Sequence, residues 1–199
     1  PGGAPPDSGG GGTKTKITLK GGWRQDGDKF EKIYDRLLSV VGNILIDTEG
    51  MDWLRNVGGS NEIAMGDFLT VIDLLLGNTG GTAGVGWADF GGELGSGTWA
   101  AITGGHGMVE GLPNNALITI AGNGAFFNSG YSVGPQRTRR NETYRMFTGG
   151  TAAAQAQILL HEIAHLFGAA ESDLGDSEAV LRNESAVMTN CRNKWRRET

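Results

Sequence analysis

The segment ILLHEIAHLFGAAESD, residues 158–173, restricts the fold of this chain more than any other part of the sequence. If it begins as a helix, His161 and His165 lie one turn apart and point the same way, so their ring nitrogens can share one metal ion. The opposite side of that helix is apolar and can anchor it in a core; it carries Leu160, Ile163, Ala164 and Phe167. The segment therefore predicts a helix with a buried back and a metal-binding front.

Glu162 follows His161 directly and lies about 100° around the same helix. At that position it is adjacent to the ion without binding it. It can take a proton from a water molecule that the metal activates and pass the proton to a leaving amine. The chain has only 3 histidines, and two of them belong to this motif. This arrangement indicates a catalytic zinc site in which Glu162 is the general base and acid.

The histidine-glutamate-x-x-histidine spacing resembles that of the zincin metallopeptidases, over about residues 155–191. The resemblance implies an α+β fold: a twisted mixed sheet, a long upstream helix, and an active-site helix below the sheet. It also implies a sheet strand along the cleft edge that pairs with an extended substrate. Residues 115–130, NALITIAGNGAFFNSG, are a candidate for that edge strand and are similar to the edge of thermolysin-like enzymes.

The third metal ligand must be a carboxylate, or the site is incomplete, because no histidine follows His165 and a catalytic zinc keeps three protein ligands and one open position. Glu171 stands where metzincins place their third ligand, after a turn at Gly168. In that alternative Met188 would form the methionine turn beneath the metal. Metzincins normally have histidine or aspartate at this point, however, so the glutamate departs from the pattern.

Two other carboxylates compete with Glu171. Glu184, preceded by an asparagine, resembles the gluzincin pattern in which a second helix delivers a glutamate. Asp173 is the ligand implied by a similarity to poorly characterised bacterial surface or secreted proteins with the same histidine motif. Asp173 is the preferred candidate, and Glu171 and Glu184 remain alternatives. Each of the three completes a set of two imidazoles and one carboxylate, which suits Zn²⁺.

The rest of the chain predicts a glycine-rich single domain. Residues 1–12 have the composition of a flexible proline-glycine linker, and the resemblance implies that residues 13–199 form one zincin-like metallopeptidase domain. Of 199 residues, 35 are glycine, and many of them fall within residues 77–111, where short strands joined by tight turns, or an irregular lobe, are expected. Alternation predicts a strand over residues 15–20, and helical periodicity predicts helices over 28–41, 67–76, from Thr151 to Gly168, and from Asp176 towards Trp195.

Net charge and hydropathy narrow the choice of partners. The formal net charge of -5 argues against nucleic acid, and no apolar run is long enough for membrane insertion. The histidine motif and the resemblance to zincins imply the function of a zinc endopeptidase acting on protein or peptide. The alternative is a non-catalytic cell-surface or interaction domain with a structural or vestigial zinc, and a zinc amidase is a third option. The linker suggests a secreted or cell-surface protein, released from or part of a longer precursor.

Overall fold

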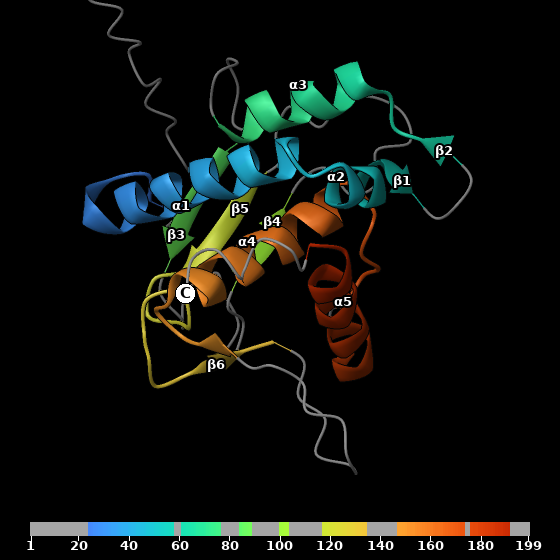
Figure 1. The fold of residues 1–199 in the computed structure, drawn as a ribbon. Helices are drawn as coiled ribbons and strands as arrows, with labels where there is room; N and C mark the ends of the chain where they lie inside the picture. The colour runs from blue at the N-terminus through green and yellow to red at the C-terminus, as the bar shows by residue number, and fades with distance from the viewer. Residues whose placement is uncertain are drawn as a thin grey trace, which may run out of the picture.

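The chain folds into an α+β structure, seen in a computed structural model that describes residues 24–57, 61–76, 84–88, 100–103, 117–134, 147–173 and 176–191 (Figure 1). These residues form five helices and three small sheets. The helices are α1 (Gly27–Leu45), α2 (Thr48–Arg55), α3 (Met65–Leu75), α4 (Ala152–Leu166) and α5 (Ser177–Asn190). The linker at residues 1–12 and the strand expected at 15–20 lie outside the described residues.

The principal sheet has three strands in the order β3-β5-β4 and is mixed. β3 (Gly84–Ala88) runs parallel to β5 (Leu117–Ala121), and β4 (Ala100–Thr103) runs antiparallel to it. β5 is therefore the central strand, and the expectation that residues 115–130 form the cleft edge was wrong. Four consecutive residues of β5, 118–121, are completely buried, so both faces of the strand are covered, as in a central strand.

Two short antiparallel pairs were not expected from the sequence. β1 (Asn56–Val57) pairs with β2 (Asn61–Glu62), and β6 (Ser132–Val133) pairs with β7 (Phe147–Thr148). Each strand has only two residues, too few to show a period in the sequence. The second pair leads directly into the turn that precedes α4.

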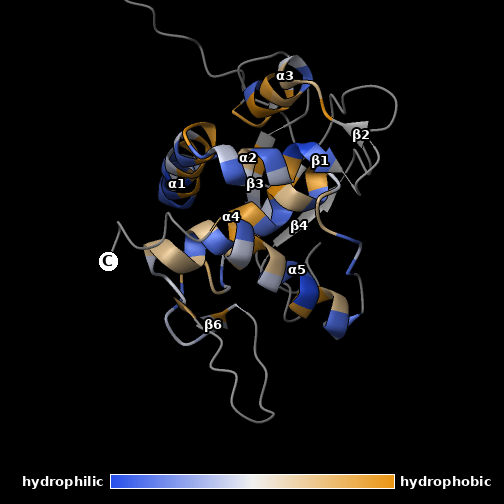
Figure 2. Ribbon diagram, turned by 45° about the vertical axis from the view of Figure 1, so that its right-hand side comes forward, coloured by the Kyte–Doolittle hydropathy of each residue, from blue (hydrophilic) through white to orange (hydrophobic). Residues whose placement is uncertain are grey.

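Helix α1 confirms the helix expected at residues 28–41 and extends it at both ends. It forms because apolar residues recur at helical spacing, and its buried face consists of Ile33, Leu37, Val40, Val41 and Ile44. α1 packs against α4 and β3. Both α1 and α4 lie on the same side of the sheet in Figure 1 and in the turned view of Figure 2.

Helix α4 is the central helix of the fold. It begins where expected, because the Thr151 side chain accepts a hydrogen bond from the Ala154 amide at 3.3 Å. All but a few of its residues are buried, since α1, α5 and β4 surround it. Beyond its end, the Phe167 ring stacks on Phe68 of α3 with centroids 4.7 Å apart. The helix is thus held in one hydrophobic core along its whole length.

Helix α5 begins at the expected cap, Asp176, whose carboxylate accepts hydrogen bonds from the Glu178 and Ala179 amides. It packs against α4 and α2. Met188 lies within this helix, so the methionine turn considered with Glu171 does not form. Among the described residues, no helix combines the length and the apolarity that crossing a bilayer requires.

Candidate metal centre

Helix α4 places the two histidines of the motif side by side near its C-terminal end. The Nε2 atoms of His161 and His165 are 3.0 Å apart, and the ring planes meet at 69°. A separation of four residues on a helix produces this juxtaposition. Both side chains are largely buried, with 10% and 12% of their surface exposed.

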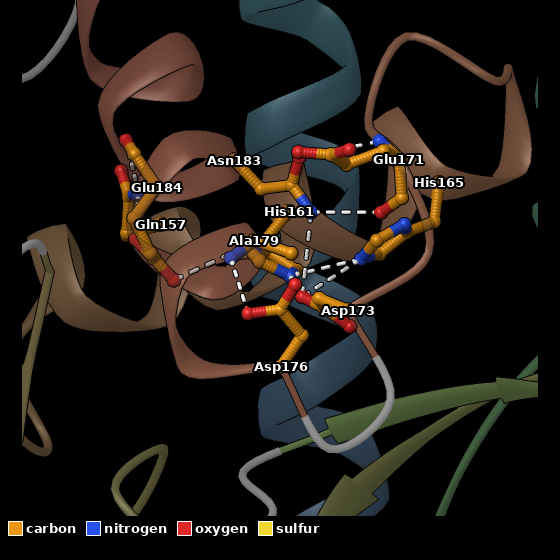
Figure 3. A network of polar contacts seen from close by, with 9 residues as sticks. All are labelled: Gln157, His161, His165, Glu171, Asp173, Asp176, Ala179, Asn183 and Glu184. Carbon is orange, nitrogen blue, oxygen red and sulfur yellow. Dashed lines mark hydrogen bonds and ion pairs between the residues drawn. The ribbon is translucent and has the colours of Figure 1, made fainter.

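A left-handed turn after α4 returns the chain to the histidines. Gly168 has φ +71°, a conformation that glycine adopts without a steric penalty. The next two amides, of Ala169 and Ala170, donate to the Ala164 carbonyl and close the helix end. The segment that follows carries Asp173 back over the α4 face, as Figure 3 shows.

Asp173 completes a triangle of donor atoms with the histidines. Its Oδ2 lies 2.9 Å from His161 Nε2 and 3.3 Å from His165 Nε2. Among the described residues, one group of three or more His, Cys, Asp or Glu side chains could hold a metal ion, and it consists of these three residues. The structure thus brings together the preferred set of sequence candidates.

The triangle has dimensions that suit zinc. Four ligands arranged tetrahedrally at about 2.0–2.1 Å from Zn²⁺ are about 3.3–3.4 Å from one another. The observed separations of 2.9, 3.0 and 3.3 Å are close to that value. Two imidazoles and one carboxylate are also the donor set of many catalytic zinc sites. The residues present therefore fit the ion.

Electrostatics of the surroundings favour a cation. Burial alone would lower the pKa of His161, but the hydrogen bond with Asp173 and the nearby Glu184 carboxylate raise it to about 10. Burial would raise the pKa of Asp173, yet contacts with the histidines bring it down to about 2. Burial and the nearby charge of His161 lower the pKa of His165. The carboxylates thus stabilise positive charge at the position where the three donor atoms meet.

Glu162 is buried beside the triangle, with 7% of its surface exposed. Burial raises its pKa to about 7; the charge of His161 opposes the rise, while those of Asp173 and Glu184 add to it. A carboxyl group with such a pKa exchanges its proton near neutral pH, which is the property required of a general base and acid.

Glu171 lies apart from the triangle. Its side chain is 53% exposed and forms an ion pair with Arg182 of α5. Only its backbone approaches the site, where it exchanges two hydrogen bonds with the Asn183 side chain. The carboxylate that metzincin spacing would predict as a ligand therefore points to solvent.

Glu184 approaches His161 from the other side of the ring. Its Oε1 is 3.2 Å from Nδ1, a distance within ion-pair reach although the contact lacks the geometry of a hydrogen bond. The triangle is formed at Nε2, so Glu184 contacts the back of the ligand and not the metal position. Its other oxygen, Oε2, accepts a short hydrogen bond from the Gln157 side chain.

Two polar residues at the site were not identified from the sequence. Gln157 is fully buried one turn before His161 on α4. Asn183 contacts both the Glu171 backbone and the Asp173 carboxylate, at 3.4 Å. The available signals were the four-residue spacing from Gln157 to His161 and the position of Asn183 directly before Glu184, and neither is distinctive by itself.

Comparison with known proteins adds no relative. No protein-family model, curated protein or solved structure matches the chain significantly.

Proposed function

We propose that this protein is a zinc-dependent peptidase with a zincin-like arrangement of its active-site helix. The observation that carries the proposal is the convergence of His161 Nε2, His165 Nε2 and Asp173 Oδ2 within 3.3 Å of one another, next to the buried Glu162. Burying charged groups costs free energy unless they are paired or bind an ion. Two imidazoles and two carboxyl groups buried together beside one helix are therefore better explained by a functional site than by packing alone.

The arrangement of elements supports the zincin-like part of the proposal. A mixed sheet, an upstream helix of 19 residues packed on α4, and contact between α4 and β4 are what that architecture requires. The outer side of β3 is engaged by backbone hydrogen bonds between Arg24 and Trp87. β4 has no further partner among the described residues and contacts α4, so we assign to β4 the substrate-pairing role first expected of residues 115–130.

Each residue has a defined part in the proposed reaction. His161, His165 and Asp173 would hold the ion, and a bound Zn²⁺ would supply Lewis acidity towards water and the scissile carbonyl. Glu162 would accept a proton from the attacking water and deliver it to the leaving amine. Burial raises the pKa of the Glu162 carboxyl above its usual range, which makes it a stronger proton acceptor.

The substitution Glu162→Gln tests this assignment directly. It removes the proton acceptor while preserving the size of the side chain, so zinc content should remain at the wild-type level. Cleavage of a labelled unstructured protein such as casein should fall by about 10²–10⁴-fold. Glu171→Gln is the matched control, because Glu171 is exposed and remote from the triangle, and it should retain activity. Full activity in Glu162→Gln would sink the mechanism.

A non-catalytic zinc domain is the second candidate, and the burial of the ligands favours it. The side chains of His161, His165 and Asp173 are only 10%, 12% and 18% exposed, so little of the ligand set is open to solvent. If this candidate is correct, the protein binds zinc stoichiometrically and hydrolyses no peptide of a library. Measurable zinc-dependent cleavage that Glu162→Gln abolishes would exclude it.

A further inference from the structure

We propose that Glu184 and Asn183, neighbours on α5, are positioning residues that hold two ligands of the metal centre from outside it. This inference rests on the proposed zinc site and deepens it. It assigns to Glu184 a role different from direct coordination, and it gives α5 a function that the histidine motif does not contain.

Glu184 contacts His161, the first of the two ligands. Glu184 Oε1 faces Nδ1 of the ring at 3.2 Å, whereas the triangle forms at Nε2. A proton on Nδ1, attracted by the carboxylate, leaves the Nε2 lone pair directed at the metal position. The carboxylate thereby favours both the ring orientation and the tautomer that present Nε2 to the metal position.

Gln157 in turn holds Glu184. Its Nε2 donates to Glu184 Oε2 and also approaches the Glu184 backbone carbonyl at 3.4 Å. Gln157 and Glu184 are 0% and 9% exposed, so solvent does not compete strongly for these contacts. The carboxylate therefore has one oxygen committed to Gln157 and the other available to His161.

Asn183 contacts the segment that carries Asp173, the second of the two ligands. The Asn183 side-chain amide donates a hydrogen bond to the Glu171 carbonyl at 2.8 Å and accepts one from the Glu171 backbone N–H at 3.2 Å. These two bonds hold the backbone of the segment that leads to Asp173. The same Nδ2 lies 3.4 Å from Asp173 Oδ2. Asn183 is 4% exposed and is thus fixed by its surroundings. Because Asn183 and Glu184 are consecutive, one turn of α5 supports ligands from both α4 and the segment after it (Figure 3).

The experiment measures the affinity of the full chain for Zn²⁺ alone, by competition with a chromophoric chelator. Glu184→Ala should weaken zinc binding by about 10–100-fold, as loss of an outer partner of a metal ligand typically does. Asn183→Ala should weaken it also. Arg182→Ala is the matched control: it is the preceding residue of α5, and its ion pairs within the described structure are with exposed Glu171 and Asp176, so zinc affinity should not change.

A second variant separates positioning from folding. Glu184→Gln keeps an oxygen for Nδ1, and its new amide can donate to Gln157 Oε1, which has no hydrogen-bond partner in the described structure. It should recover most of the affinity lost in Glu184→Ala. In the Co²⁺-substituted protein, Glu184→Ala should shift the visible absorption bands, because the ligand field changes when His161 reorients. A residue with only a structural role would lower the melting temperature of the metal-free protein and leave these bands unmoved.

The outcomes distinguish this inference from the proposed function. Wild-type zinc affinity and unshifted Co²⁺ bands in Glu184→Ala would overturn the positioning role and leave the metal centre standing. If Glu184→Ala does not fold, wild-type zinc affinity in Asn183→Ala would overturn the positioning role. A wild-type protein that binds no zinc would refute both, and one that binds zinc without cleaving peptides would refute only the peptidase.

Discussion

His161 has a different carboxylate at each ring nitrogen, and this asymmetry defines the site at the scale of residues. Asp173 lies at Nε2 with His165, and Glu184 lies at Nδ1. Imidazole can coordinate a cation through one nitrogen and orient itself through the other. The three acidic candidates therefore separate by position: Asp173 lies with the donor atoms, Glu184 behind a ligand, and Glu171 in solvent.

Removing Asp173 should therefore abolish tight zinc binding. Asp173→Ala deletes one of the three converging donors, and the zinc dissociation constant should rise by more than about 100-fold, since losing even an outer partner costs about 10–100-fold. Glu171→Ala, two residues away, should leave the constant unchanged, because an exposed ion pair with Arg182 contributes little. Isothermal titration with Zn²⁺ provides both values. A larger loss in Glu171→Ala than in Asp173→Ala would reverse the assignment.

Spacing alone did not choose among these carboxylates, for physical reasons. The position of Asp173 depends on the left-handed turn at Gly168 and on the hydrogen bond from the Asn183 side chain to the Glu171 backbone. The sequence indicated the turn at Gly168, but the contact of Asn183 joins two separate segments and leaves no pattern in the sequence. The two histidines were placed correctly side by side because a helix fixes residues four apart locally.

At the scale of elements, the sequence predicted the starts of α4 and α5 but not the pairing of the strands. α4 and α5 begin at Thr151 and Asp176, as their caps predict, since capping involves residues only two or three apart. β5 was recognised as a strand but assigned to the wrong place in the sheet. Its partner β3, GVGWA, alternates glycine with larger residues, and no local pattern reveals that it pairs in parallel with β5. α2 was not predicted.

The close packing of the turn before α4 leads to a prediction about that element. A Cβ on Gly149 would lie 2.8 Å from the Ala125 carbonyl oxygen and closer still to that of Asn128. These are backbone atoms that cannot rotate away, so Gly149→Ala should lower the free energy of unfolding by about 2 kcal/mol or more. Urea denaturation of the metal-free protein measures the change.

Gly42 offers the matched control. It lies on the exposed side of α1, and a Cβ there would meet no atom within 4 Å. Gly42→Ala should raise the free energy of unfolding by about 0.5–1 kcal/mol, because alanine loses less conformational freedom in a helix. If Gly149→Ala were as stable as Gly42→Ala, the segment that carries the chain into α4 would not be packed as described.

At the scale of the whole molecule, the candidate metal centre adds a polar connection between α4 and α5, which also pack directly against each other. Two donors belong to α4 and the third to the segment between α4 and α5, which Asn183 of α5 holds. α5 also packs on α2, and α4 packs on α1 and β4. A ligand at this point therefore reinforces contacts among most of the described helices.

Zinc should consequently stabilise the entire folded protein. An ion that binds only the folded state at 100 times its dissociation constant adds about 2.7 kcal/mol. For a chain of this size, that corresponds to a rise in melting temperature of roughly 5–10 °C. Differential scanning calorimetry with and without Zn²⁺ should show the rise, and a chelator should reverse it. Mg²⁺ should have little effect, because it prefers oxygen ligands and retains its water.

The variant His165→Ala makes this test specific to the site. It removes one donor from the end of α4 while Asp173 and the core helices remain, so zinc should no longer raise the melting temperature appreciably. Its metal-free melting temperature provides the baseline for any loss of packing. An equal zinc-induced rise in wild type and His165→Ala would mean that the stabilising ion binds elsewhere, and the connection between α4 and α5 would then depend on the protein contacts alone.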